Sequence, residues 1–224
     1  MDYKEKRLKL VEHLTKRNFL TKPTVIKAML KVPRHKFLPK GAIESAYIDS
    51  PISIGMGQTI SAPHMNAMMC ELLELTEGEK VLEIGTGSGY HAALCAELVA
   101  PKHTKNPGHV YTIERHQDLA DRAEESLTNT GYGDVVTVIR GDGTLGYPEK
   151  APYDKILVTA SSPKKVPPPL KHQLKDQGIL CIPAGSKEGG QDLYIISKIG
   201  ENFESKKITG VRFVPLIGEW GFPE

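Results

Sequence analysis

The sequence predicts an α/β fold, doubly wound around a mostly parallel sheet, with a helical N-terminal appendage and an antiparallel C-terminal edge. The first observation behind this class is order: from Lys80 onward, short apolar runs of strand length alternate with helical patterns. The second is the end of the first run, where Ile84 passes into a glycine-dense turn and then into a helix. The third is that the two ends of the chain lack this alternation: the N-terminal end has only helical periodicity, and the C-terminal end has only strand-like segments.

The expected elements follow from periodicity and from helix-breaking residues. Residues 4–20 and 22–32 have helical periodicity, and Pro33 and Pro39 end that pattern. The core elements are then expected, in order, as strand 80–84, helix from about 90, strand 109–113, helix 118–128, strands 135–140 and 154–159, helix near 170, and strand 179–183. Such alternation implies helices on both faces of the sheet.

The last forty residues lose the helix-strand alternation. The segments 193–197 and 211–214 have the pattern of strands, and the polar stretch 200–207 separates them. We expect them to form the antiparallel edge of the sheet.

Composition narrows the classes of function. The chain has 224 residues, 39% of them hydrophobic and 25% charged, which is ordinary for one globular domain. No apolar run is long enough to span a bilayer and no apolar signal region is seen at the N-terminus, so we expect a cytoplasmic protein without a membrane partner. A net charge of +2 gives little attraction to nucleic acid, and we expect a monomer without a nucleic-acid partner.

The cysteines suggest neither a disulfide framework nor a metal centre. Three are present, far apart and without a Cys-x-x-Cys pair: Cys70, Cys95 and Cys181. We expect each to be a small core residue and no metal to be bound.

The turn after the first strand is the most informative motif. It reads Gly-x-Gly-x-Gly, whereas a dinucleotide fingerprint reads Gly-x-Gly-x-x-Gly. Glycines here allow a sharp turn and a close approach of a ligand to the backbone in front of a helix N-terminus. With the acidic Glu83 before it, the turn resembles the first motif of Rossmann-like methyltransferases, which bind S-adenosyl-L-methionine. Its residues are Gly85, Thr86, Gly87, Ser88 and Gly89.

Residues that follow the next strands are the next candidates, because ligands of open parallel sheets bind beyond the carboxyl ends of the strands. Glu114 follows the second strand, where a carboxylate can accept hydrogen bonds from both ribose hydroxyls of an adenosine; a surface glutamate is the alternative. The segment Gly141-Asp142-Gly143 follows the third, where Asp142 can accept from an adenine amino group, or can simply form a tight turn. After the fourth strand stands Thr159-Ala-Ser-Ser, and no Asn-Pro-Pro-Tyr-like motif of base methylation appears.

A polar, glycine-flanked loop precedes the first strand of the core. Ser61 stands where a helix N-cap is expected, with Pro63 in the first turn, and a capping hydroxyl is one interpretation. The other is a substrate carboxylate docked at the helix N-terminus beside the serine. Gln58 and Thr59 add hydrogen-bonding groups, and His64 either joins them or faces solvent.

These motifs together resemble the protein-L-isoaspartate O-methyltransferase family over nearly the whole chain. The Gln-Thr-Ile-Ser segment is the most specific part of the match. The matching segments are Val32-Pro33-Arg34, Phe37-Leu38-Pro39, Ala46-Tyr47-Ile48-Asp49, residues 57–65, the glycine turn, residues 141–143, residues 151–154, Pro169-Leu170 with Gln173-Leu174, and Val214-Pro215-Leu216. Asp176-Gln177-Gly178 departs from the family, which usually has a pair of glycines there.

The resemblance implies a fold, a reaction and a set of site residues. The fold would be of the Rossmann-like methyltransferase type, and the reaction would transfer a methyl group from S-adenosyl-L-methionine to isoaspartyl residues of damaged proteins and peptides. Ser61 would be the active-site hydroxyl. The cofactor would be bound by Gln58, Thr59, Ile60, His64, Glu83, the turn Gly85 to Gly89, Glu114, Arg115, Gly141, Asp142 and Gly143. The acceptor peptide would be bound by Ile60, Ser61, Val214, Pro215 and Leu216.

On this interpretation residues 1–224 form one methyltransferase domain with three parts. Residues 1–75 would carry the helical extension and the acceptor loop, 76–185 the cofactor-binding core, and 186–224 the C-terminal strands. Three alternatives remain: a methyltransferase for another acceptor such as RNA, a noncatalytic cofactor sensor, and a nicotinamide-dependent oxidoreductase, which the glycine spacing disfavours.

Overall fold

The computed structural model describes residues 2–102 and 104–224. Its core is a seven-stranded sheet in the order β5-β4-β3-β6-β7-β8-β9. The strands are β3 (Lys80–Ile84), β4 (His109–Glu114), β5 (Val136–Arg140), β6 (Tyr153–Val158), β7 (Leu174–Gly185), β8 (Gln191–Ile199) and β9 (Asn202–Val211). Neighbours from β5 to β7 are parallel, whereas β7, β8 and β9 pair antiparallel. The mostly parallel sheet with an antiparallel edge is therefore confirmed.

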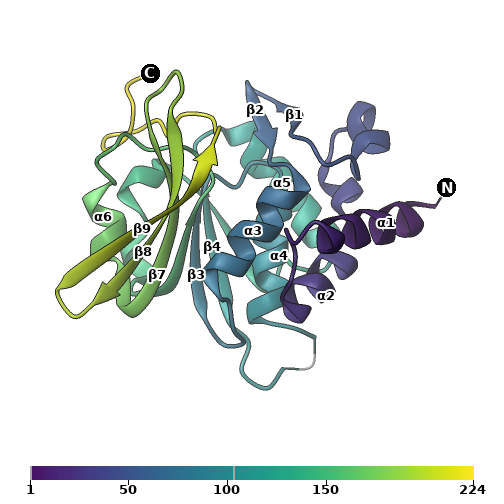
Figure 1. Ribbon diagram of the computed structural model, residues 1–224, viewed down its shortest axis with the longest axis horizontal. Helices are drawn as coiled ribbons and strands as arrows, with labels where there is room; N and C mark the ends of the chain where they lie inside the picture. Colours follow the sequence, from purple (N-terminus) through teal and green to yellow (C-terminus); the bar gives the residue numbers. More distant parts are fainter. Residues whose placement is uncertain (1, 103) are drawn as a thin grey trace.

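Six helices accompany the sheet among the described residues. They are α1 (Tyr3–Lys16), α2 (Pro23–Lys31), α3 (Pro63–Leu73), α4 (Tyr90–Val99), α5 (Gln117–Asn129) and α6 (Pro168–His172). Short 3₁₀ helices are η1 (Arg34–Phe37), η2 (Lys40–Ser45), η3 (Gly143–Leu145) and η4 (Pro148–Lys150). In Figure 1, α1 and α2 lie at one end of the molecule, beside α3 and α4, and β8 and β9 lie at the other. No helix in the described ranges has the length and apolar character needed to cross a membrane.

The two faces of the sheet pack against different helices. Side chains alternate along a strand, so Val81 of β3 and Leu157 of β6 belong to the cluster formed with α1 to α5. Their neighbours Leu82 and Ile156 face the other way and pack with Leu170 of α6. Helices thus cover both faces of the sheet, with five of the described helices on one face and the short α6 on the other. Glu83 stands two residues after Val81, so its side chain lies on the face covered by α3 and α4.

The C-terminal edge differs from the sequence expectation. The polar stretch 200–207, predicted to separate two strands, instead contains the turn and the first half of β9, and the strand predicted at 211–214 is wrong because β9 ends at Val211. The exposed outer strand tolerates polar side chains, since only one of its faces packs against the protein. Period-2 apolar alternation therefore gave no signal there.

A small hairpin ahead of α3 was also missed. The strands β1 (Ile52–Gly55) and β2 (Gln58–Ile60) pair antiparallel, with Ile52 opposite Ile60, in a segment where the sequence indicated only a loop. The turn holds Gly55 and Gly57 at φ of 93° and 69°. These left-handed conformations favour glycine, and they bring the segment back toward the carboxyl ends of the core strands.

Candidate active site

A crevice opens at the carboxyl ends of β3, β4 and β6. Its empty space, including the part open to solvent, is about 570 Å³. Walls come from the glycine turn, the residues after β4, the hairpin strand β2 and the segment after β9. The strand order places β3 between β4 and β6, so the chain leaves β3 in one direction and returns on the other side, the position where open sheets bind ligands.

The glycine turn is held against β6. Gly85 has a φ of 94°, and a Cβ there would lie 2.4 Å from Thr159 Oγ1, so only glycine fits. Thr159 Oγ1 donates to the carbonyl of Gly85 at 2.7 Å. Gly89, at a φ of 83°, forms the N-cap of α4. Gly85 and Gly87 therefore line the crevice, whereas Thr86 and Ser88 line a smaller cavity beside it and Gly89 lines neither.

Glu114 is tied to this turn. Its carboxylate is buried, with Oε2 accepting from the Gly87 N–H at 2.9 Å and Oε1 from the His116 N–H at 3.0 Å. Each carboxylate oxygen has a second lone pair, and the residue lines the crevice. Arg115 also lines it, and pairs with the carboxylate of Glu224. The position supports the ribose interpretation over that of a surface glutamate.

Of the three residues after β5, only one lines the crevice. Gly143 lines the crevice, and a Cβ there would lie 2.4 Å from Ile84 Cγ2. Asp142 and Gly141 lie outside the lining. Asp142 Oδ1 accepts from the Thr144 N–H at 2.8 Å, and Oδ2 accepts from the Glu219 N–H at 2.7 Å. In this structure the Asp142 side chain stabilises the turn and the C-terminal segment, which is the second of the two interpretations drawn from sequence.

Glu83 lies beneath the crevice rather than in its wall. The side chain is fully buried, and burial raises its pKa to about 7. Thr112 Oγ1 donates to Oε2 at 2.5 Å, while Oε1 has no hydrogen-bond partner among the described residues. A carboxyl in this setting keeps its proton to a higher pH than an exposed glutamate does.

A wider cleft adjoins the crevice. It is lined by Ser61, His64, Arg212 and Val214 among others, and Thr59, Thr159 and Val214 line both spaces. Gln58 lines the crevice only, and Pro215 and Leu216 line it with Val214. The buried side chain of Ile60 reaches only a small polar cavity between β2 and the glycine turn, whose walls also include Ser61, Thr86, Ser88 and His91.

The prediction that Ser61 caps α3 is wrong by one residue. The helix begins at Pro63 with Ala62 at the N-cap, and no side chain of that residue caps it. Asp49 takes the capping role instead, because its Oδ1 accepts from the His64 N–H and from the His64 Nδ1–H, both at 2.9 Å. Ser61 therefore keeps its hydroxyl for the cleft.

Arg34 fixes the backbone of Ser61 from behind. The guanidinium is fully buried and donates to the carbonyls of Ser61 at 2.7 Å and Ala46 at 2.9 Å, and to Asn66 Oδ1 at 3.1 Å. It also lies 4.9 Å from the ring centre of Tyr90. Burial lowers the pKa of Arg34 to about 10, yet the group stays charged at neutral pH. Sequence reasoning quoted Arg34 as part of a motif without finding this role.

Two further crevice residues had little or no sequence signal. His116 lines the crevice, and its Nε2 is buried without a hydrogen-bond partner in the part of the chain that the structure describes. Thr159 also lines the crevice, and its hydroxyl donates to the carbonyl of Gly85 in the glycine turn. Both lie just after core strands, which is the one signal that could have marked His116.

Comparison with known proteins gives a consistent result. Residues 5–221 match the family model described as protein-L-isoaspartate(D-aspartate) O-methyltransferase. The chain is 51% identical over 225 residues to the protein-L-isoaspartate O-methyltransferase of Hyperthermus butylicus, covering 99% of this chain and 92% of the relative. It is 53% identical over 215 residues to that of Ignicoccus hospitalis, covering 96% and 99%.

Solved structures agree with the sequence matches. One protein-L-isoaspartate O-methyltransferase structure superposes with a TM-score of 0.85 at 30% identity, covering 96% of this chain and 67% of that one. A second, a putative enzyme of this kind from Plasmodium falciparum in complex with S-adenosyl-L-homocysteine, has a TM-score of 0.83 at 29% identity, covering 94% and 98%. Both similarities extend over nearly all of this chain.

Proposed function

The chain belongs to the protein-L-isoaspartate(D-aspartate) O-methyltransferase family, and we propose that its reaction takes place where the crevice meets the cleft. The enzyme transfers a methyl group from S-adenosyl-L-methionine to the free carboxylate of L-isoaspartyl residues in damaged proteins and peptides, which starts their repair. The single observation that supports this location is the shared lining: Thr59, Thr159 and Val214 border both spaces, with Ser61 beside them.

The crevice fits the cofactor. At Gly85 a side chain would collide with Thr159, so the backbone is kept open to a ligand. Glu114 offers two carboxylate oxygens for a ribose, and the orphaned His116 Nε2 has a hydrogen bond left to make. S-adenosyl-L-methionine, when bound, supplies a methyl group activated by a positively charged sulfonium. We assign its binding to the turn Gly85 to Gly89, Glu114, Arg115, His116 and Gly143.

Ser61 would orient the acceptor without acting as a base. A free carboxylate has a pKa near ~4 and is already an anion at neutral pH, so no proton has to be removed. The Ser61 hydroxyl would donate to one carboxylate oxygen and leave the other directed at the crevice. Strong stabilisation of the carboxylate would slow the reaction, because its charge is lost in the transition state. A single neutral hydroxyl suits this requirement better than an arginine or a lysine.

The cleft suits an extended peptide. β1 and β2 form a two-stranded sheet, so the second edge of β2 has no strand partner among the described residues. Thr59 of β2, the following Ser61 and Val214 all line the cleft. A peptide strand can pair with such an exposed edge through its main chain. We infer that isoaspartyl sites in flexible segments are methylated faster than those in rigid ones.

Charge and cysteine chemistry bear on the acceptor and the setting of the enzyme. A net charge of +2 and a cleft whose described lining holds one Lys, Arg, Asp or Glu side chain, Arg212, favour peptide over nucleic acid. All three cysteines are free thiols, which suits a reducing cytoplasm. We propose that the enzyme works there as a monomer.

The deciding experiment uses one synthetic peptide in two forms, with isoaspartate or with normal aspartate at the same position. Incubation with methyl-labelled S-adenosyl-L-methionine should give a base-labile methyl ester on the isoaspartyl form alone. Label on RNA instead would identify the nucleic-acid alternative. Cofactor binding in calorimetry without transfer to any acceptor would identify the noncatalytic sensor, and either result would overturn the proposal.

A further inference from the structure

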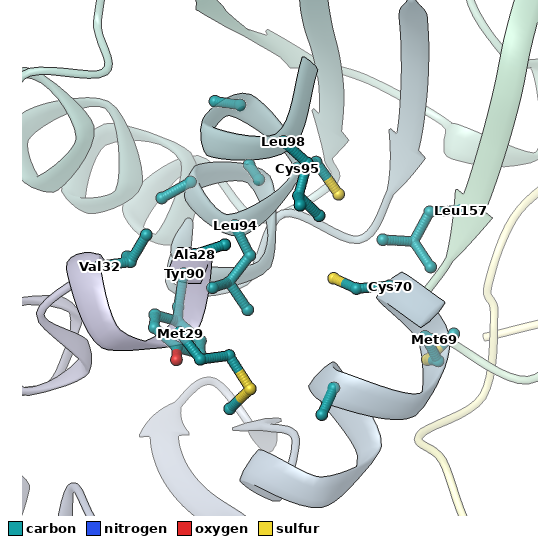
Figure 2. Packing of buried hydrophobic residues seen from close by; sticks show 14 of the residues in the cluster. Ala28, Met29, Val32, Met69, Cys70, Tyr90, Leu94, Cys95, Leu98 and Leu157 are labelled. Atoms are coloured by element: carbon teal, nitrogen blue, oxygen red, sulfur yellow. The ribbon is translucent and has the colours of Figure 1, made fainter. Parts of the chain in front are cut away.

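A buried cluster of three reactive side chains lies outside the residues assigned to methyl transfer. Cys70 of α3 meets His91 and Cys95 of α4, and their sulfur and nitrogen atoms all lie within 4.8 Å of one another. The exposed fractions are 1%, 6% and 0%. His91 and Cys95 are four residues apart, so they project from one face of α4. Figure 2 shows the Cys70 and Cys95 side chains directed into the space between the two helices.

The hydrogen bonds around His91 fix where its ring proton sits. Arg34 can only donate, so the atom of Asn66 that faces it at 3.1 Å must be the oxygen. The Asn66 amide nitrogen then donates to His91 Nδ1 at 3.1 Å. His91 Nδ1 is therefore an acceptor, and the ring proton lies on Nε2, which is 3.4 Å from Cys70 Sγ.

This arrangement argues against a metal ion. Two thiolates and an imidazole are ligands that soft metals prefer, but binding would need the Nε2 lone pair that the proton occupies. Freeing it would require the Asn66 amide to turn its NH₂ group toward Arg34, leaving two donors face to face. The cluster is better explained by thiol chemistry.

Cys70 and Cys95 have opposite acid-base character. Contact with the Cys95 thiol, helped by the adjacent Nε2–H of His91, outweighs burial and lowers the pKa of Cys70. The same contact and burial raise the pKa of Cys95. Cys70 therefore gives up its proton more readily than Cys95, an asymmetry found in dithiols that oxidise to disulfides.

We propose that Cys70 and Cys95 are an oxidisable pair that forms an intrachain disulfide between α3 and α4, with hydrogen peroxide as the oxidant. The Cys70 thiolate attacks a peroxide oxygen, the O–O bond breaks, and Cys70 becomes a sulfenic acid while the released hydroxide takes up a proton. The Cys95 sulfur then attacks the Cys70 sulfur, the S–S bond forms and the S–O bond breaks. The proton of Cys95 leaves with the hydroxyl group as water, so two thiols and one peroxide give one disulfide and two waters.

Only one side chain separates Cys70 from a polar cavity. His91 lines the cavity between Ser61 and the glycine turn, and its Nε2 lies 3.4 Å from Cys70 Sγ. Cys181 offers an internal comparison, because it is equally buried and its pKa is raised by that burial. The disulfide would link two helices that begin directly after the acceptor loop and the glycine turn.

The test is a thiol map of the intact enzyme. Reduced protein is treated with hydrogen peroxide, denatured, alkylated and digested, and the cysteine peptides are identified by mass. The expected product lacks two hydrogen atoms, joins the peptides of Cys70 and Cys95, and leaves Cys181 alkylated. Complete alkylation at all three positions, or oxidation of Cys181 as fast as Cys70, would overturn the proposal.

Two variants sharpen the assignment. Cys181→Ala removes the unrelated thiol and should keep the cross-link. Cys95→Ser keeps a hydroxyl beside Cys70 but cannot form a disulfide, so it should abolish the cross-link and leave a sulfenic acid on Cys70 that dimedone traps. If Cys95→Ser fails to fold, the map of the unmodified chain together with Cys181→Ala decides the question. A dimedone adduct on Cys181 and none on Cys70 would again contradict the inference.

Discussion

At the scale of single residues, Ser61 combines an anchored backbone with a hydroxyl that borders the cleft. We predict that Ser61→Ala lowers kcat by about tenfold to a hundredfold, since the hydroxyl no longer orients the attacking carboxylate and a misplacement of about 1 Å can cost about a hundredfold. Cofactor affinity should stay within about twofold by calorimetry. Ser61→Thr keeps the hydroxyl and should recover part of the rate. A loss of cofactor binding that matches the loss of kcat would refute this division of roles.

Arg34 affects the same reaction only by holding the backbone of Ser61 in place. One guanidinium holds the carbonyls of two separate segments and the amide of Asn66, which a lysine ammonium cannot span in one fixed fork. We predict that Arg34→Lys and Arg34→Met both lower kcat, by about tenfold or more, with a smaller change in cofactor Kd. Assays should run well below the Tm of each variant. Unchanged kcat in a folded Arg34→Met enzyme would show that the anchor is only structural.

At the scale of elements, the segment after β9 closes the crevice by lying against the turn after β5. A Cβ at Gly218 would fall 2.0 Å from Asp142 Oδ1. The other oxygen of the same carboxylate, Oδ2, accepts from the Glu219 N–H. We predict that Gly218→Ala weakens cofactor binding by calorimetry. Gly189→Ala is the matched control, because Gly189 has the same φ of 154° with open space where the Cβ would lie. Equal behaviour of the two variants would mean that the segment does not shape the crevice.

At the scale of the whole molecule, Glu83 makes stability depend on pH. Its pKa is raised from 4.5 to about 7 in the folded state, mainly by burial. Between those values the folded chain binds more protons than the unfolded chain, so the free energy of unfolding falls as pH rises through this window. The loss amounts to about 3 kcal/mol at most.

Glu83→Gln tests this linkage because a glutamine stays neutral at every pH. Urea unfolding of both proteins at pH 5 and pH 8 should show that the wild type loses more stability than the variant between the two conditions. Effects of the substitution that do not depend on pH cancel in this double difference. Parallel changes in the two proteins would contradict the prediction.

The sequence by itself determined the fold class, the family and most of the crevice. Periodicity and glycine spacing are local signals, and the residues after β3 and β4 could be assigned because parallel strands end at a common edge. Gly85, Gly87 and Glu114 were found in this way, and all three line the crevice, while their roles toward the cofactor stay predictions. The division into three parts within one domain stays a prediction.

Only the tertiary structure decided which side chains meet across elements. Arg34 and Ser61 are 27 residues apart, and Cys70 and His91 are 21 apart on different helices, so no spacing rule joins them. The start of α3 depended on whether Asp49 or Ser61 reached the first turn. Strand β9 was missed because an edge strand with a solvated face carries little apolar alternation. Such outcomes depend on long-range packing and burial, which a linear pattern does not contain.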